Sequence, residues 1–438
     1  MYICGRKDKE SMIQEIKIKN FLSFKDEVKF SFEASNDKFA EDSQVVQINE
    51  NTRLLRFAIV YGYNASGKSN LLSVIQTLHD FWFKKPEDVD ERINIVPFKL
   101  DVSSPNQPSE FEIVFYVDSV KYCYHLVVNQ QFVHSEKLYY YKSSQPTLLF
   151  DRAFEDGQSS IHFNPALKIS SLVKENITVR CLKNMSLFSA RNQINTSIPL
   201  IDVAKDWLKS DFLRPIIPTT DLTSYAQKKI SNDRNLTKYV LGFLHEADFN
   251  ITNIKTDVIF YPMSEDVLDM ILHAEEISKE EKERIAIEKS WKQLRTEFEH
   301  TVENERGIET YQLSPSENEE SRGTMRTFGI EAALYYALKH SAFMSIDEIE
   351  TSLHPKLLEM ILYEYLKTSS RSQLLVTTHN DGLLDLIDDL IRKDSVWFTE
   401  KDKAGVTDLY KLTDFRGVNR LSSIREAYRN KRFGATMK

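Results

Sequence analysis

Cysteine is rare in this sequence, and its positions exclude two kinds of stabilised fold. Among 438 residues there are three cysteines, Cys4, Cys123 and Cys181, and they lack the close spacing of zinc ligands. Such scattered residues also argue against a disulfide framework of the kind that stabilises small secreted domains. We therefore expect reduced thiols and a cytoplasmic protein.

Flexible linkers, membrane-spanning segments and a basic surface are missing as well. Glycine and proline number only 12 each, which is low for a chain with long flexible linkers. The most apolar stretches, such as 57–61 and 342–346, have the length of a strand and not the about 20 residues of a membrane-spanning helix. A net charge of -8 means that any contact with DNA must be local. We expect neither membrane association nor a secretion signal.

The first part of the chain predicts a lobe rich in antiparallel strands around one helix. An apolar content of 41% is ample for the core of one large or two ordinary domains. Alternating apolar residues predict paired strands, and one continuous apolar run leads through a turn into a helical pattern. Strands are expected at 13–21, 28–32, 54–61, 111–117, 122–128 and 137–142, and a helix at 70–83.

The middle of the chain is polar and helical in pattern, whereas its end alternates helices and strands. The stretch 277–305 is rich in charge and predicts one long helix or two short ones. After a polar turn at 314–318, the alternation of elements predicts a parallel sheet. Helices are expected at 327–340 and 355–367, and strands at 342–346, 373–377 and 395–400. The predicted segments are thus 12–185, 186–310 and 311–438.

A phosphate-binding turn is predicted between the strand at 54–61 and the helix at 70–83. Residues 62–69 read GYNASGKS and match GxxxxGK[ST], in which glycines let backbone N–H groups surround phosphate oxygens at a helix N-terminus. Lys68 is expected to reach the β- and γ-phosphates of ATP, and the Ser69 hydroxyl to ligate Mg²⁺. The predicted ATP-binding residues here are Gly62, Asn64, Ala65, Ser66, Gly67, Lys68, Ser69 and Asn70.

Polar residues with catalytic chemistry end the two strands that follow. Asp347 and Glu348 directly follow the strand at 342–346. In proteins with a phosphate-binding loop of this kind, called a P-loop, such an Asp holds magnesium and the Glu acts as general base. Solvated acids commonly end strands, so the pair indicates a catalytic site only in combination with the P-loop. His379 ends the next strand, where it could bind the γ-phosphate or the attacking water, or be an ordinary surface histidine.

A second anion site is suggested at the start of the helix that precedes the acidic strand. Ser321 and Gly323 lie just before this helix, where a serine can cap the helix and the N-terminus attracts anions. A capped helix start with no further role is the alternative.

The order of these segments resembles a known family. GYNASGKS, ESRGT, FMSIDEIETSLHP and LLVTTHN resemble the Walker A, signature, Walker B with D-loop, and H-loop elements of ABC-type ATPases. Within that class, DEIETSLHP, the start IQEIKIKNFLSFKDEV and the ending REAYRNKRFGA are similar to the stand-alone bacterial AAA-15/AAA-21 group. These are relatives of SMC and DNA-repair ATPases that often occur in anti-phage and abortive-infection loci. The likeness covers 12–150 and 310–438 and is weak between them.

The resemblance implies an α/β fold of the ABC/SMC-type P-loop ATPase head, with mixed antiparallel and parallel sheets and a helical insertion. Segments 12–185 and 311–438 would be its lobes I and II. The insertion at 186–310 would be a shortened version of the SMC arms, with a solvated helical subdomain as the alternative.

The resemblance also implies hydrolysis of ATP with Mg²⁺ in a homodimer. Ser321 and Gly323 would then contact the γ-phosphate bound by the other subunit. Arg322 and His354 replace a signature glycine and the D-loop Asp of transporters, which suits the SMC-like branch. The implied catalytic residues are Lys68, Glu348 and His379, and the implied metal ligands are Ser69 and Asp347. Gln107 is the candidate for the glutamine that links magnesium to the opposite lobe, with an ordinary loop residue as the alternative.

Three functions follow as hypotheses. The first is a sensor or switch in an anti-phage defence system, controlling a partner effector such as a nuclease or toxin. We expect no TOPRIM nuclease of the kind that OLD-type relatives carry. The second is a DNA-repair or DNA-structural ATPase, and the third, disfavoured by the β-rich first lobe, is a transport energiser. A DNA-binding surface would use Lys183, Arg191, Lys228, Lys229 and Arg234, which interspersed surface charge also explains.

Overall fold

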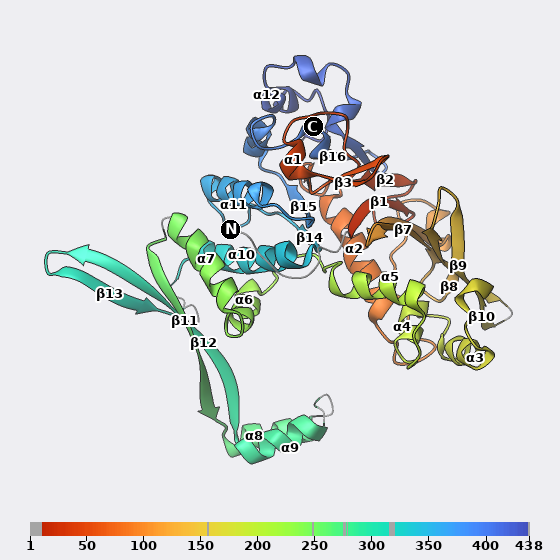
Figure 1. The fold of residues 1–438 in the computed structure, drawn as a ribbon, viewed down its shortest axis with the longest axis horizontal. Coiled ribbons are helices and arrows are strands. Elements are labelled where there is room, and N and C mark those ends of the chain that lie inside the picture. The colour runs from red at the N-terminus through yellow and green to blue at the C-terminus, as the bar shows by residue number, and fades with distance from the viewer. Residues whose placement is uncertain are drawn as a thin grey trace. The chain divides into compact units, whose positions relative to one another are not determined.

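The computed structural model (Figure 1) describes residues 11–155, 157–247, 249–274, 277, 279–314 and 320–436. They form two compact units, the first from described residues of 1–219, 336–351 and 358–438 and the second from Thr220–Tyr335 and Ser352–Leu357. The predicted segments 12–185, 186–310 and 311–438 stay a prediction. Cys4 and most of the polar turn predicted at 314–318 lie outside the described residues.

The first sheet of the first unit is antiparallel throughout. Its strands are β1 (Met12–Lys19), β2 (Val28–Ser31), β6 (Ser109–Val117), β7 (Val120–Val128), β8 (Val133–Tyr141), β9 (Pro146–Glu155) and β10 (Gln158–Phe163). Their order in the sheet is β10-β9-β8-β7-β6-β1-β2. The predicted pairing of the first two strands and the hairpin of β6 and β7 are both confirmed.

The second sheet of this unit is largely parallel, as predicted. Its strands are β5 (Phe57–Tyr61), β14 (Phe343–Ile346), β15 (Gln373–Thr378), β16 (Val396–Lys401) and β17 (Thr407–Lys411). The order is β14-β15-β5-β16-β17, and only the β16–β17 pairing is antiparallel. The carboxyl ends of β5, β14 and β15 therefore lie at one edge of the sheet, where the predicted catalytic residues follow. The predicted α/β fold class with antiparallel and parallel sheets is confirmed.

The continuous strand predicted at 54–61 is interrupted at Arg56. β4 (Thr52–Leu55) pairs with β3 (Val45–Asn49), and β5 begins after the break. The buried Arg56 guanidinium donates hydrogen bonds to the carbonyl oxygens of Ser43 and Thr368, both at 2.7 Å. These non-local contacts stop the strand although its residues are apolar on both sides.

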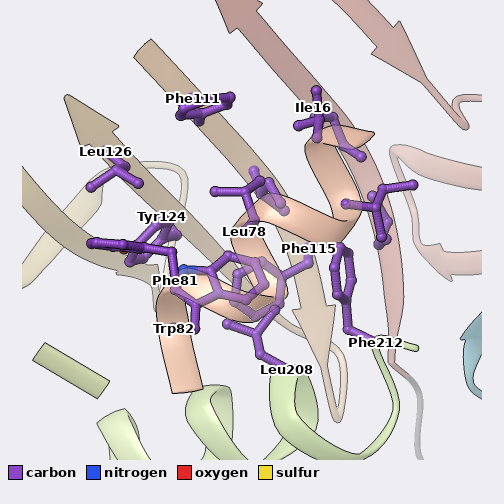
Figure 2. Close-up of a cluster of buried hydrophobic side chains, with 14 of the residues drawn as sticks. Ile16, Leu78, Phe81, Trp82, Phe111, Phe115, Tyr124, Leu126, Leu208 and Phe212 are labelled. Carbon is purple, nitrogen blue, oxygen red and sulfur yellow. The ribbon is translucent and has the colours of Figure 1, made fainter. Parts of the chain in front are cut away.

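One apolar core joins both sheets to α2 (Lys68–Phe83), the helix that follows the predicted phosphate-binding turn. Figure 2 shows Leu78 and Trp82 of α2 among the side chains of Phe115 and Tyr124 from the first sheet. The rings of Trp82 and Tyr124 have centroids 5.4 Å apart in an edge-to-face arrangement, and both side chains are fully buried. Burying such a ring contributes about 2–3 kcal/mol, so this packing fixes α2 and hence the position of its N-terminus.

The remaining helices of the first unit are short. They are α1 (Glu41–Gln44), α3 (Ser171–Arg180), α4 (Leu187–Arg191), α5 (Pro199–Ser210) and α12 (Ile424–Arg429). Cys123 and Cys181 are free and buried, and burial raises the pKa of their thiols to about 12 and about 11 respectively. Both thiols are therefore protonated near neutral pH, and the expectation of reduced cysteines stays a prediction.

The second unit combines helices with a sheet of order β11-β12-β13. Its elements are α6 (Leu222–Ile230), α7 (Arg234–Glu246), β11 (Ile251–Pro262), α8 (Glu265–His273), α9 (Lys279–Glu288), β12 (Ser290–Asn304) and β13 (Gly307–Leu313). Two further helices, α10 (Arg322–His340) and α11 (Pro355–Lys367), begin in this unit and end in the first. Val240, Phe298 and Phe328 belong to its core. In Figure 1, α8 and α9 lie at the end of the ribbon that β11 and β12 form.

The prediction of helix throughout 277–305 is wrong for its second half. α9 is helical, but the residues after it form β12, which pairs with β11 on one side and with β13 on the other. Thr296 and Phe298 are buried and their neighbours are partly exposed, which is the period-two pattern of a strand. The high charge of this stretch concealed that alternation.

No helix in the described part of the chain has the length and apolar character needed to cross a membrane.

Candidate functional site

The turn between β5 and α2 has two positions that only glycine fits. Gly67 has φ 112°, and a Cβ there would lie 2.5 Å from Thr407 Oγ1. At Gly62 a Cβ would lie 2.3 Å from Ser66 Oγ and 2.8 Å from the carbonyl oxygen of Thr399 in β16. The turn thus curls tightly at the N-terminus of α2, the geometry that lets backbone N–H groups surround a phosphate.

Gly62→Ala is expected to lower the affinity for ATP at least about tenfold, because the new Cβ meets a strand carbonyl that cannot move freely. Fluorescence titration with a labelled ATP analogue measures this change. Gly242→Ala in α7 is the matched control: its Cβ would meet nothing within 4 Å, and it should leave binding unchanged while stabilising the helix by about 0.5–1 kcal/mol. Equal affinities of the two variants would show that the turn does not bind nucleotide.

Asp347 and Glu348 directly follow β14 and are both held by Thr377 of β15. The Thr377 hydroxyl donates to Asp347 Oδ1 at 2.5 Å and accepts the backbone N–H of Glu348 at 2.9 Å. Asp347 is buried, whereas Glu348 is partly exposed and has φ 46°. A left-handed backbone at a non-glycine residue costs about 1–3 kcal/mol and persists where surrounding contacts fix it. The predicted acidic pair is therefore rigidly placed.

His379 follows β15 and contacts a third carboxylate, Glu350, in the turn after β14. Glu350 Oε1 accepts the backbone N–H of His379 at 2.7 Å and also lies 2.7 Å from its Nδ1. The side chain of His379 is 54% exposed and that of Glu350 only 11%. Glu350 was not among the residues predicted from the sequence, although its place two residues after Glu348 was the available signal.

Lys68 is the first residue of α2, and the charges of these acids act on its ammonium group. Its Nζ donates to the carbonyl oxygen of Gly62 at 2.7 Å. Burial lowers the pKa of the Lys68 ammonium below its usual range, while the carboxylates of Glu350, Glu348 and Asp347 oppose that shift. The structure therefore brings the predicted lysine and the predicted acidic pair into one electrostatic site.

The other predicted residues of the turn fall into two groups. Asn64, Ala65 and Ser69 are exposed, and Ala65 has φ 66°. Ser66 and Asn70 are engaged within the protein, since Ser66 Oγ lies 2.7 Å from Thr399 Oγ1 and Asn70 Nδ2 donates to Ser23 Oγ at 2.6 Å. Their side chains hold the turn in place, and only their backbone groups remain for a ligand.

The residues present fit ATP and Mg²⁺. The glycine-lined turn suits phosphate oxygens, and the exposed Ser69 hydroxyl and the Asp347 carboxylate are oxygen ligands of the kind that magnesium prefers. Within the described residues there is no group of three or more His, Cys, Asp or Glu side chains that would form a separate metal site.

The signature segment lies in the second unit, at the start of α10. Ser321 caps this helix, since its Oγ accepts the backbone N–H of Thr324 at 3.0 Å. Gly323 is packed closely, because a Cβ there would lie 3.1 Å from the carbonyl oxygen of Ser352 in the D-loop. The predicted cap is confirmed, and the role of Ser321 and Gly323 in binding a phosphate stays a prediction.

Arg326 lies on the second turn of α10, five residues after Ser321, and is 9% exposed. Its Nε and Nη2 are buried, and neither has a hydrogen-bond partner in the described part of the chain. Burial lowers the pKa of its guanidinium. This arginine was not predicted from the sequence, where no motif marks it.

Comparison with solved structures finds similarity to SMC heads. The SMC head domain from Thermotoga maritima matches with 11% identity and a TM-score of 0.40, covering 91% of this chain and 98% of that one. The SMC head with an extended coiled coil, bound to the C-terminal domain of ScpA derived from Pyrococcus furiosus, matches with 12% identity and a TM-score of 0.42, covering 96% and 99%. Likeness at this level carries no functional argument. A search of curated protein sequences found no match.

A family model matches most of the chain. It is described as "AAA domain, putative AbiEii toxin, Type IV TA system" and matches residues 57–178 and 216–385. These ranges contain the P-loop, the signature segment, Asp347, Glu348 and His379. Because the match spans more than half of the chain, the protein belongs to this AAA-domain family.

Proposed function

We propose that the chain is an ATP-hydrolysing switch that closes as a homodimer around ATP. The observation that carries this is that Thr377 holds Asp347 and Glu348 at the sheet edge where the phosphate-binding turn with Lys68 also begins. Lys68 and the backbone N–H groups of the turn would bind the β- and γ-phosphates. Mg²⁺ held by Ser69 and Asp347 would neutralise phosphate charge.

Hydrolysis would use Glu348 as the general base. Its carboxylate accepts a proton from water as the water oxygen attacks the γ-phosphorus, and the bond to the bridging oxygen breaks to give ADP and phosphate. His379, at the end of the neighbouring strand, would contact the γ-phosphate or this water. Lys68, Glu348 and His379 are thus the residues proposed for catalysis.

Arg326 supports the proposal of a dimer. Two of its guanidinium nitrogens, Nε and Nη2, are buried without a hydrogen-bond partner among the described residues, which costs free energy unless another group compensates them. Arg326 lies on the second turn of α10, shortly after Ser321 and Gly323, the residues proposed to contact the γ-phosphate held by a second copy. An anion supplied by that copy would compensate it.

The biological role that fits best is regulation of an abortive-infection type defence system in the cytoplasm. The description of the family names the AbiEii toxin and a type IV toxin–antitoxin system. Timed closure and opening of the dimer would control a partner effector, such as a nuclease or toxin. Detection of ATP-dependent growth arrest when the chain is expressed with its neighbouring genes tests this role.

The alternative of a DNA-repair or DNA-structural ATPase loses part of its support. Arg191 is buried and pairs with Asp202 at 2.9 Å, so it is wrong as part of a DNA-binding surface. Lys183 pairs with Asp90 at 3.0 Å.

Gln107 is exposed and remains only a candidate for the magnesium-linked glutamine.

Ser321→Arg is expected to spare ATP binding but to prevent dimer formation, because a long cation would fill the place of the γ-phosphate contact. Light scattering after gel filtration with ATP and Mg²⁺ measures the mass. Ser170→Arg is the matched control, since Ser170 is also an exposed serine that caps a helix, α3. A dimer formed equally by both variants would refute the trans contact.

A further inference from the structure

Glu350 and His379 form a contact that fixes the position of the histidine ring. Glu350 lies in the turn after β14 and His379 directly follows β15, so two parallel strands bring them together. One oxygen, Glu350 Oε1, accepts the backbone N–H of His379 and contacts its Nδ1, both at 2.7 Å. The acid is largely buried beneath a ring that is half exposed. Backbone and ring are therefore held by one carboxylate oxygen.

This contact favours one of the two ring nitrogens as the site of the proton. A negative carboxylate oxygen 2.7 Å from Nδ1 stabilises a proton on that nitrogen. Nε2 of His379 is then the nitrogen left to interact with another group. A histidine without such a partner would exchange between tautomers and ring orientations.

Glu350 also belongs electrostatically to the nucleotide site. Among the acids that act on the pKa of Lys68, it has the largest effect, ahead of Glu348 and Asp347. Its second oxygen, Oε2, is buried and has no hydrogen-bond partner in the described part of the chain. Glu350 thus acts on the charge of Lys68 as well as on His379.

We infer that Glu350 is a positioning residue, which holds the proton on Nδ1 of His379 and so presents Nε2 to the γ-phosphate region of bound ATP. The inference deepens the proposed ATPase function and rests on it for the nucleotide contact. The alignment of the ring matters most in the transition state, because only there does charge shift between the attacking water and the γ-phosphate.

The first experiment needs no nucleotide. The full chain, labelled with ¹⁵N-histidine, is studied by NMR, and the His379 ring signals are assigned by their loss in His379→Ala. In the wild type we expect the protonated-nitrogen signature at Nδ1. Glu350→Ala should remove this preference, whereas Glu350→Gln, which retains an acceptor oxygen, should keep most of it. An unchanged Nδ1 signature in Glu350→Ala would overturn the inference.

The second experiment measures steady-state ATP hydrolysis. Glu350→Ala and His379→Ala should each lower kcat about tenfold or more, part of the about 10²–10⁴-fold that a positioned acid or base contributes, with KM for ATP changed less than about twofold. The double variant should be no slower than His379→Ala, because the two residues act as one unit. Losses that multiply in the double variant would overturn the inference, since Glu350 would then act independently of His379.

A matched control tests whether the loss of any carboxylate, and not of the one that contacts His379, would give the same effects. Glu359→Ala removes an exposed carboxylate from α11 and should change neither the NMR signature nor kcat. If the wild type hydrolyses no ATP, the proposed function fails, while the NMR comparison still decides whether Glu350 sets the His379 tautomer. The two failures are thus distinguishable.

Discussion

Glu348→Gln is expected to bind ATP with nearly wild-type affinity and to hydrolyse it about 10²–10⁴-fold more slowly. Glutamine has the size of glutamate and keeps its polarity, but it cannot accept a proton from the attacking water. The backbone at this position should persist, because Thr377 holds the Glu348 N–H and not its side chain. The variant should therefore accumulate as a closed dimer with intact ATP.

Two measurements check this outcome. Phosphate release gives the hydrolysis rate, and gel filtration with light scattering shows whether the variant remains dimeric after ATP is added. Glu359→Gln on α11 makes the same chemical change at an exposed position and should behave as the wild type. Wild-type hydrolysis by Glu348→Gln would reassign the general base, and Glu350 would be the next carboxylate to test.

Local patterns predicted the phosphate-binding turn and its helix well. The turn is encoded within eight consecutive residues, and α2 begins at Lys68, two residues before the predicted helix start. The strand β12 was missed because its conformation depends on pairing with β11 and β13, which local charge does not reveal. In the same way, the break at Arg56 depends on carbonyl groups that come from distant residues.

The candidate site shows a similar division. The residue types and spacing of Lys68, Asp347 and Glu348 were enough to point to their chemistry, although their roles stay predictions. Thr377 and Glu350 were not predicted, because their contacts join the ends of two strands about 30 residues apart in the chain. Sequence patterns thus identified groups that suit the reaction, whereas the groups that position them emerged only from the fold.

Arg152→Met is expected to lower the free energy of unfolding of the first unit by about 3–5 kcal/mol. Arg152 in β9 and Glu136 in β8 are fully buried and form an ion pair at 3.0 Å. Arg152 also donates to the carbonyl oxygen of Leu182 at 2.6 Å. Without the guanidinium, the Glu136 carboxylate keeps the hydroxyl hydrogen bonds of Tyr124 and Ser186 but loses its only cationic partner among the described residues.

Urea unfolding followed by fluorescence measures this cost, and the neighbouring ion pair supplies the control. Lys137 and Asp151 join the same two strands at 3.1 Å, but both side chains are about one third exposed. Lys137→Met should therefore cost only about 0–1 kcal/mol, because water already screens the pair. Equal losses in the two variants would show that burial does not determine the strength of the Arg152 contact. A larger loss in Arg152→Met would show that burial makes the contact of Arg152 with Glu136 stronger than the exposed pair beside it.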